Sequence, residues 1–380
     1  HDALPIYSFV IDYSLINGGG VSRGDVIQYF VAAQDAANNL SSNPAGAGSS
    51  GSPPIQNVNV HGTVNSYTIV ATPEGTKSIG PTGDYASIGA AVSAIQAVGL
   101  SGPLILELQA GYVSTVETFP LVIGNLGTTV SKTVTLRPEP GAVGLIISSA
   151  SATAATVDLN GAQFLTIDGR AGGMGVASQL TITNTNPSSF ASGVALRFIN
   201  EASNNRVIYT KLTGVNTGAN AGVVIFGTTT GTGGNDNNTL DHCDISDGAS
   251  QPGYTIYGAG TTVSTASNNS GNRIVNCNIF NFRTSGLYLD VGNSDWEIAG
   301  NSFYQTTSRA VTAAAVRAIY INNVDGNNFV VSGNFVGGSA AEAGGTAWTT
   351  TGTTAAYQFV AIQLNVGTLQ PTSVQGNTIK

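Results

Sequence analysis

One short pattern recurs six times in the C-terminal two thirds of the chain: an apolar residue, two spacers, a small or amide residue, one spacer and a second apolar or aromatic residue. The copies begin at Val207, Leu240, Ile274, Ile298, Val331 and Val374. Successive copies start between 24 and 43 residues apart, which is too irregular for a helical repeat but natural for a coil whose loops vary in length. The pattern therefore predicts a solenoid, a fold that carries many unrelated activities.

A second apolar segment precedes each motif and alternates with period two, so we expect its first, third and fifth residues to point inward. Its members are Val194–Phe198, Val223–Ile225, Ile256–Tyr257 (the weakest), Leu287–Val291, Ile319–Ile321 and Ile362–Val366. Each turn then contains a strand, a bend, a second strand and a variable loop, as in a right-handed parallel β-helix. Further turns around Val157 to Ile167 and Leu180 to Ile182 bring the expected number of coils to about eight, at roughly 4.8 Å each.

The small or amide position of the motif predicts a structural ladder. Its residues are Thr210, Cys243, Cys277, Asn301, Asn334 and Asn377. Stacked Asn amides can hydrogen-bond from coil to coil, and Cys can fill the same slot as a small buried residue. The two cysteines could instead form a disulfide or a soft-metal site, but two Cys with the adjacent His242 do not complete a zinc shell.

Composition is typical of a secreted all-β protein. Only 9% of the residues are charged and 49 are glycine, which is strand-and-turn usage. The net charge of -8 argues against a nucleic-acid partner. Because the sequence has no apolar run of 18 residues, we expect no membrane span. We predict an extracellular or bacterial cell-surface location and no obligatory cofactor.

The segment before the solenoid predicts an N-terminal cap. Its apolar residues Ile88, Ala91, Val92, Ile95 and Val98 lie at helical spacing and end at Gly99. Strands are expected at Pro103–Leu108 and Thr133–Pro138. An amphipathic helix here would cover the exposed edge of the first coil. Between Gly80 and about Gly141 this order resembles the opening of pectin methylesterases and other pectin-lyase-like β-helix proteins.

The catalytic motifs that this resemblance would imply are absent. Pectin methylesterases carry Gly-Tyr-x-Asp-Thr-Leu, whereas the superficial match Gly111–Thr115 has Ser114 in place of the Asp. Aligning the coils places Asp241 beside Val275, and Asp244 beside Asn278, so the carboxylates do not stack. We therefore expect a non-catalytic module, with a polysaccharide lyase or hydrolase and a filament-forming structural protein as alternatives.

Acidic residues after the Gly233–Asn238 loop raise a calcium hypothesis. Asp236, Asp241 and Asp244 are the candidate ligands, because Ca²⁺ prefers carboxylate and carbonyl oxygens. The sequence matches neither an EF-hand nor the glycine-rich calcium repeats. A solvated turn leading into a strand is the alternative.

A column of tyrosines is the sharper candidate site. Tyr257, Tyr288 and Tyr320 should occupy the same outward position on successive coils, after Val224 and before Gln363. The residues expected beside them are Arg197, Phe226, Asp290, Asn322 and Asn365. Such a face suits a polysaccharide, whose sugar faces stack on rings and whose hydroxyls bind amides and carboxylates. The alternative is that the tyrosines only stack on one another.

Residues 1–70 differ from the remainder, 71–380. We expect strands at Leu4–Ile11, Asp25–Asp35 and Asn65–Val70, and a polar linker at Asn38–Pro54. These strands resemble the closing part of an immunoglobulin-like or fibronectin-type sandwich, whose missing strands should lie before His1. The whole arrangement is similar to large multidomain extracellular proteins of type IX-secreting bacteria, which implies adhesion or polysaccharide handling. The expected partners are a polysaccharide and other domains of the same chain.

The C-terminal motif leads to one more expectation. Asn377 is a ladder residue and Lys380 follows it at once, without a capping element. We hypothesise that the chain is an interior piece of a longer protein, which a stop codon directly after Lys380 would contradict.

Overall fold

The computed structural model describes residues 10–16, 20–22, 24–35, 37, 39–44, 63–186, 193–218, 220–310, 315–352 and 357–380. The chain divides after Thr72 into two units, His1–Thr72 and Pro73–Lys380. Each unit is described by itself.

The described part of the first unit contains two antiparallel strand pairs. Strand β1 (Val26–Tyr29) pairs with β4 (Asn65–Thr68), and β2 (Val31–Gln34) pairs with β3 (Leu40–Asn43). A short 3-10 helix, η1, covers Tyr13–Leu15. The predicted strand Leu4–Ile11 lies almost wholly outside the described residues, and the immunoglobulin-like sandwich stays a prediction.

The expected polar linker Asn38–Pro54 contains a strand in its described part. This strand is β3 (Leu40–Asn43). The turn before it is fixed by Asp35, whose Oδ1 accepts hydrogen bonds from the backbone N–H groups of Ala37 (2.9 Å) and Asn39 (2.8 Å). A side chain that caps its own turn can start a hairpin in a polar segment.

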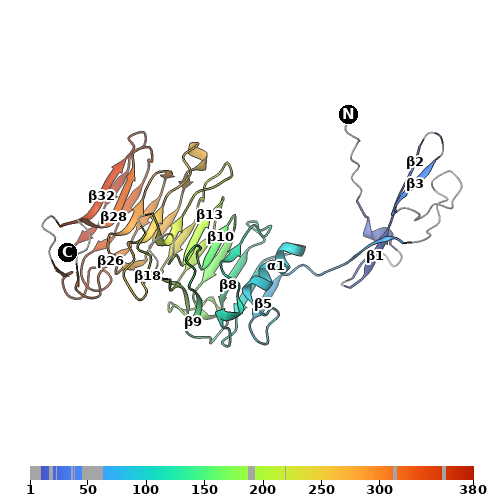
Figure 1. Cartoon of the computed structure of the whole chain (residues 1–380), viewed down its shortest axis with the longest axis horizontal. Helices are drawn as coiled ribbons and strands as arrows, with labels where there is room; N and C mark the ends of the chain where they lie inside the picture. Colours follow the sequence, from blue (N-terminus) through green and yellow to red (C-terminus); the bar gives the residue numbers. More distant parts are fainter. Residues whose placement is uncertain are drawn as a thin grey trace. The chain divides into compact units, whose positions relative to one another are not determined.

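The second unit is a right-handed parallel β-helix, which confirms the predicted fold class (Figure 1). Its three parallel sheets are here named sheets 1, 2 and 3. In the described residues, sheet 1 contains β7 (Leu121–Ile123), β10 (Val157–Asn160), β13 (Leu196–Ile199), β16 (Gly222–Phe226), β19 (Tyr254–Gly258), β23 (Ser285–Leu289), β28 (Ala315–Asn323) and β32 (Gln358–Val366).

Sheet 2 contains, in the described residues, β5 (Gly75–Ile79), β6 (Leu104–Leu108), β8 (Val134–Pro138), β11 (Leu165–Asp168), β14 (Arg206–Ile208), β17 (Thr239–Asp241), β21 (Arg273–Val275), β25 (Glu297–Ala299), β29 (Val330–Ser332) and β33 (Ser373–Gln375). Sheet 3 contains, over the same described part, β9 (Leu145–Ser149), β12 (Leu180–Asn184), β15 (Lys211–Gly214), β18 (Asp244–Asp247), β22 (Asn278–Phe280), β26 (Ser302–Tyr304), β30 (Phe335–Val336) and β34 (Thr378–Ile379).

Short elements decorate the loops. They are η3 (Ser114–Val116), η4 (Ala171–Gly173), η5 (Thr265–Ser267), the parallel pair β20 (Asn269–Ser270) with β24 (Asn293–Ser294), and the parallel pair β27 (Arg309–Ala310) with β31 (Thr350–Thr351). Of the described helices, none has the length and apolar character needed to cross a membrane.

The register of sheet 2 is the register that the repeated motif predicts. The first apolar residues of the six copies pair with one another on successive coils. The first five are fully buried, and Val374 on the last coil is 47% exposed. Asp241 pairs with Val275, and Asp244 pairs with Asn278, as the coil alignment predicts. The motif therefore fixes which residues face the core, because a slip of one residue would turn every side chain to the opposite face.

The predicted cap is an 11-residue helix, α1 (Ile88–Val98). Ser87 caps its N-terminus by accepting a hydrogen bond from the Ala90 N–H (3.0 Å), and Gly99 ends it with φ of 75°. The carboxylate of Glu117 also accepts the N–H of Ile88 (2.6 Å) and of Gly89 (3.0 Å). The helix is thus held to the first coils both by its apolar face and by a charge at its positive end.

Hydrogen bonds run along the predicted ladder column. Asn301 Nδ2 donates to Asn334 Oδ1 (3.0 Å), and Asn334 Nδ2 donates to Asn377 Oδ1 (2.9 Å). The Cys277 N–H donates to Asn301 Oδ1 (2.9 Å), and the Cys243 N–H donates to Cys277 Sγ (3.4 Å). Both cysteines are buried and free, and burial raises the pKa of Cys277. Thr210 bonds within its own coil, to the Ile208 carbonyl.

A second amide column was missed from the sequence. Asn205 Nδ2 donates to Asn238 Oδ1 (2.9 Å), and Asn238 Nδ2 donates to Asn272 Oδ1 (3.1 Å). All three are fully buried, directly before strands of sheet 2. The signal was present, because an Asn stands two residues before the first apolar residue in three consecutive copies of the motif.

Candidate functional site

The outer surface of sheet 1 carries a cluster of four tyrosines, named here the tyrosine face: Tyr254, Tyr257, Tyr288 and Tyr320. Strict alternation fails in these strands, because two consecutive residues, Thr255 and Ile256, are both fully buried. The equivalent residues Val223 and Val224, and Ala318 and Ile319, are buried in the same way. Outward positions therefore lie three residues apart, and Tyr254 joins the face.

The predicted tyrosine column is present in the register. Tyr257 pairs with Tyr288, Tyr288 with Tyr320, and Tyr320 with Gln363. The residue before Tyr257 in this column is Ile225, not the predicted Val224. The paired buried residues shift the phase of the strand by one position, which simple alternation does not anticipate.

The tyrosine rings cover one another. Tyr288 and Tyr320 stack with centroids 4.8 Å apart and planes 8° apart. Tyr288 also contacts Tyr257 at 5.5 Å and Tyr254 at 5.3 Å, and the Arg317 guanidinium carbon lies 4.5 Å from the centroid of the Tyr320 ring. Ring faces are thus occupied by protein, so the face presents ring edges and hydroxyl groups rather than the stacking platforms expected from the sequence.

Burial raises the pKa of three tyrosines of this face, Tyr254, Tyr257 and Tyr288. Tyr257 is only 5% exposed, and the other three tyrosines are half-buried. Desolvation raises the pKa of Tyr288 to about 12, and a hydrogen bond with Asn322 opposes part of that rise. Desolvation, followed by the charge of Asp290, raises the pKa of Tyr257, and desolvation also raises that of Tyr254. The hydroxyls of these three tyrosines therefore remain hydrogen-bond donors through the physiological pH range.

Polar side chains border the tyrosine face. Asp290 Oδ2 accepts from the Tyr257 hydroxyl (3.4 Å), and Asn365 Nδ2 donates to Asn322 Oδ1 (3.0 Å). Arg317 Nε donates to Gln363 Oε1. Asp290 is the one carboxylate in this set, so the face offers hydrogen bonding with many neutral donors and acceptors rather than a pair of acids.

Two residues, Arg197 and Phe226, do not occupy the positions beside the tyrosines that the sequence predicted. Arg197 stands in the tyrosine column itself, because it pairs with Ile225. Its guanidinium binds the buried Asp158 through both carboxylate oxygens, with Nε to Oδ1 at 2.9 Å. Phe226 points inward, is fully buried and stacks on Phe198 at 4.5 Å. The one-residue shift in the inward and outward positions of these strands explains both wrong predictions. Arg197 forms a structural ion pair.

The calcium candidates are not gathered into one site. Asp236 lies in a loop and accepts the Ser270 N–H (2.7 Å), and burial raises its pKa. Asp241 belongs to sheet 2, whereas Asp244 belongs to sheet 3 and accepts from Asn278 Nδ2 (2.8 Å). Within the described ranges, no three His, Cys, Asp or Glu side chains converge as metal ligands would. Each carboxylate instead bonds to the protein.

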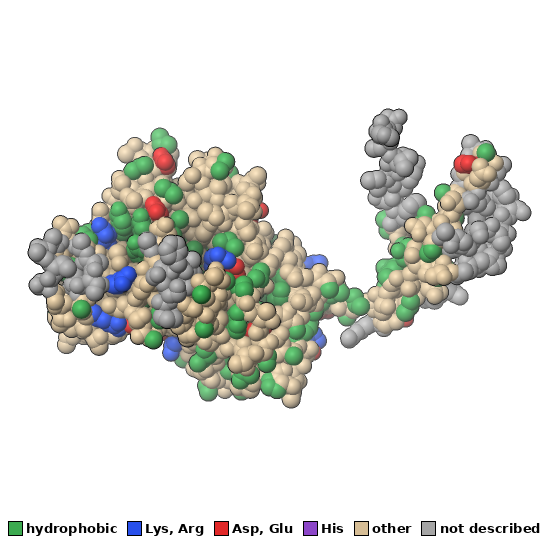
Figure 2. All heavy atoms as spheres, in the orientation of Figure 1, with side chains coloured by type: hydrophobic (Ala, Val, Ile, Leu, Met, Phe, Trp, Pro, Cys, Tyr) green, Lys and Arg blue, Asp and Glu red, His purple; other side chains and the backbone are tan. Residues whose placement is uncertain are grey.

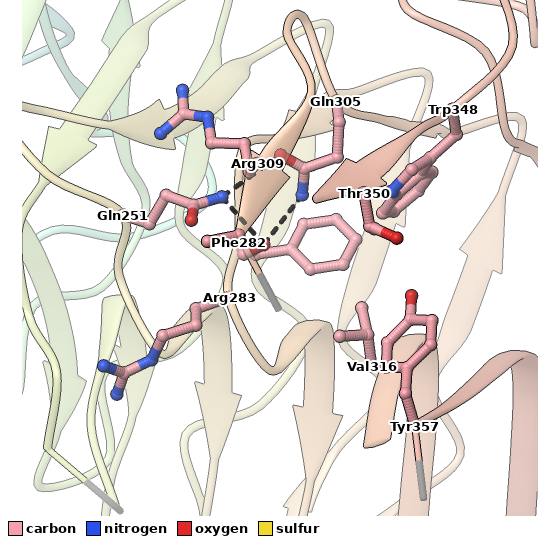
Figure 3. A pocket seen from close by; sticks show the side chains of 10 residues that line it. Gln251, Phe282, Arg283, Gln305, Arg309, Val316, Trp348, Thr350 and Tyr357 are labelled. Carbon is pink, nitrogen blue, oxygen red and sulfur yellow. Dashed lines mark hydrogen bonds between the residues drawn. The ribbon is translucent and has the colours of Figure 1, made fainter. Parts of the chain in front are cut away.

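A small cavity lies between loops near the start of β28 and β32 (Figure 3). Phe282, Trp348 and Tyr357 turn their rings toward it, and the Phe282 and Trp348 centroids are 5.6 Å apart. Gln251 and Gln305 bond to the Phe282 carbonyl at 3.3 and 2.7 Å. Its volume of about 20 Å³ has room for one water molecule, not for a sugar ring.

Comparisons with known proteins show fold likeness only. No family model matches the chain, and no curated protein matches it. Among solved structures, it is similar to the GH136 lacto-N-biosidase of Eubacterium ramulus at 7% identity and a TM-score of 0.38, over 80% of this chain and 68% of that one. It is also similar to PfbA, a surface adhesin of Streptococcus pneumoniae, at 13% identity and a TM-score of 0.38, over 78% of this chain and 90% of that one.

Proposed function

We propose that the protein is a non-catalytic, extracellular or cell-surface β-helix module that binds polysaccharide along the tyrosine face. The observation that carries this proposal is the set of phenol groups on successive coils, beside Asp290, Asn322 and Asn365. Coils repeat about every 4.8 Å, close to the length of one sugar residue in an extended glycan. One coil can therefore serve one sugar residue.

Hydrogen bonding, not ring stacking, is the mode that the geometry supports. A sugar presents several hydroxyls, and the face presents phenol, amide and carboxylate groups that are held rigidly by the ring contacts. Glycoside hydrolysis generally uses two carboxyl groups on either side of the scissile bond. Asp290 alone matches a binding role.

Tyrosine to phenylalanine substitutions separate the two modes. We expect native affinity electrophoresis against neutral polysaccharides to show retardation of the wild-type chain and its loss in Tyr288→Phe and Tyr320→Phe, because each variant keeps the ring but removes the hydroxyl. The matched control is Tyr304→Phe, since Tyr304 stacks on Phe280 at 4.8 Å on sheet 3. That control should migrate like the wild type.

Three results would contradict the proposal. Phe variants that bind as well as the wild type, when Tyr288→Ala does not, would show that the hydroxyls contribute nothing. Release of reducing ends would show catalysis. Absence of retardation on every polysaccharide would favour a purely structural module.

A further inference from the structure

A groove of about 480 Å³ runs over the outer surface of sheet 2, separate from the tyrosine face. We name it the sheet 2 groove. It spans the coils of β14, β17, β21 and β25, and its lining residues used below are Arg206, Thr239, Asp241, Arg273, Asn276 and Glu297.

The groove arises because side chains become smaller from coil to coil. The bend after each sheet 2 strand holds Tyr209, His242, Asn276 and Gly300 at equivalent positions, each with φ between 48° and 67°. Tyr209 and His242 stack at 4.7 Å, whereas Asn276 and Gly300 leave the next two coils open. Ala299, which also lines the groove, has a small side chain. The groove therefore results from the small residues that the sequence places on these coils.

One edge of the groove is a column of cationic side chains. Arg206 pairs with Thr239, and Thr239 pairs with Arg273, so the two arginines flank the threonine hydroxyl. Two coils separate the arginines by roughly 9–10 Å at the backbone. The side chain of Arg206 is exposed and has no hydrogen-bond or ion-pair partner in the described part of the chain. Arg273 Nε bonds to Glu297 Oε2 at 2.6 Å, which raises the pKa of Arg273.

The opposite edge can bind hydroxyl groups. Asp241 Oδ1 accepts from His242 Nδ1 (2.6 Å) and from Asn276 Nδ2 (3.2 Å), which fixes the carboxylate at the rim. Its second oxygen remains an acceptor for a ligand hydroxyl. The groove therefore combines an anion-binding edge with a hydroxyl-binding edge, the two chemistries of a sugar that carries a carboxylate or sulfate.

We propose that the sheet 2 groove binds an acidic polysaccharide, with one carboxylate or sulfate group of the ligand between Arg206 and Arg273. A guanidinium fork on each side and the Thr239 hydroxyl beneath fit the planar or tetrahedral oxygens of such a group. Glu297 competes for Arg273, so the bound anion has to displace part of an existing exposed ion pair. The site is independent of the tyrosine face and can act whether or not that face binds glycan.

Substitutions with opposite expected effects test this proposal. We expect affinity electrophoresis on polygalacturonate, and on chondroitin sulfate, to show that Arg206→Gln weakens binding three- to tenfold. Glu297→Gln should strengthen binding at least twofold, because it frees Arg273, and a misfolded variant would not gain affinity. Lys211→Gln is the matched control, since Lys211 is an exposed cation on sheet 3 of the same coil as Arg206.

The outcomes separate the groove from general electrostatics. Binding of either polyanion that falls in Arg206→Gln, rises in Glu297→Gln and is unchanged in Lys211→Gln and Tyr288→Phe supports the site. An equal loss in Lys211→Gln, or equal competition by inorganic polyphosphate, overturns it, because net charge alone would then explain binding. Absence of binding to both acidic polysaccharides also overturns it.

Discussion

Truncating one ladder amide should destabilise the β-helix far more than its small volume suggests. In Asn301→Ala the Cys277 N–H loses its acceptor Oδ1, and the Nδ2 donations to the Ile274 carbonyl and Asn334 Oδ1 are lost. An orphaned buried donor costs about 1–3 kcal/mol, and each further lost bond about 0.5–1.5 kcal/mol. The free energy of unfolding should therefore fall by about 2–6 kcal/mol, measured by urea unfolding followed by circular dichroism.

Two companion variants make this reasoning refutable. Asn301→Cys should recover part of the loss, because Cys277 fills the same slot one coil earlier and accepts the Cys243 N–H through its sulfur. Asn365→Ala, which removes an exposed amide with one side-chain bond, should change stability by no more than about 0.5 kcal/mol. If Asn301→Ala behaved like Asn365→Ala, the ladder bonds would be a consequence of stacking and not a source of stability.

Two further predictions concern charge. The pKa values of Tyr288 and Tyr304 are raised from 10.0 to about 12, mainly by desolvation. Their contribution to stability is therefore complete below pH 10 and is lost as pH rises through about 12. An alkaline titration in which Tyr288→Phe and Tyr304→Phe remove phenolate absorbance that appears near pH 10 would contradict this. Glu117→Gln removes the charge at the N-terminus of α1 and should lower the free energy of unfolding by about 0.5–2 kcal/mol. Urea unfolding measures this change. An unchanged unfolding midpoint would show that the hydrogen bonds to Ile88 and Gly89 survive without the charge.

The sequence was informative wherever a residue points into the core. The motif predicted the inward column of sheet 2 and the pairing of Asp241 with Val275, and the helical spacing from Ile88 predicted α1. These features repeat or follow a fixed period, so several coils support each assignment. A single strand carries no such support, which is why β3 was mistaken for linker.

The outer face of sheet 1 was harder to predict, for a local reason. Thr255 and Ile256 are both buried, so a period of two gives the wrong phase on one side of this point. Tyr254 was missed, and Phe226 was assigned outward. Ring orientation was a further limit, since the sequence gives Tyr288 and Tyr320 the same column but does not state that their faces cover each other.

Inward and outward residues of this fold are under different physical constraints. Inward residues contact neighbouring coils: Asn301 is hydrogen-bonded to the coil on each side, and the fully buried Phe226 stacks on Phe198 of the preceding coil. A change there is therefore transmitted along the helix. Charged groups on the outer surface are sparse and scattered in the view of Figure 2. The side chain of Arg206 makes no hydrogen bond or ion pair in the described residues. Exposed unpaired cations add little to stability. Arg206→Gln should therefore leave the unfolding transition unchanged while it weakens binding of the acidic polysaccharide. This is the behaviour expected of a residue that binds a ligand and does not stabilise the fold.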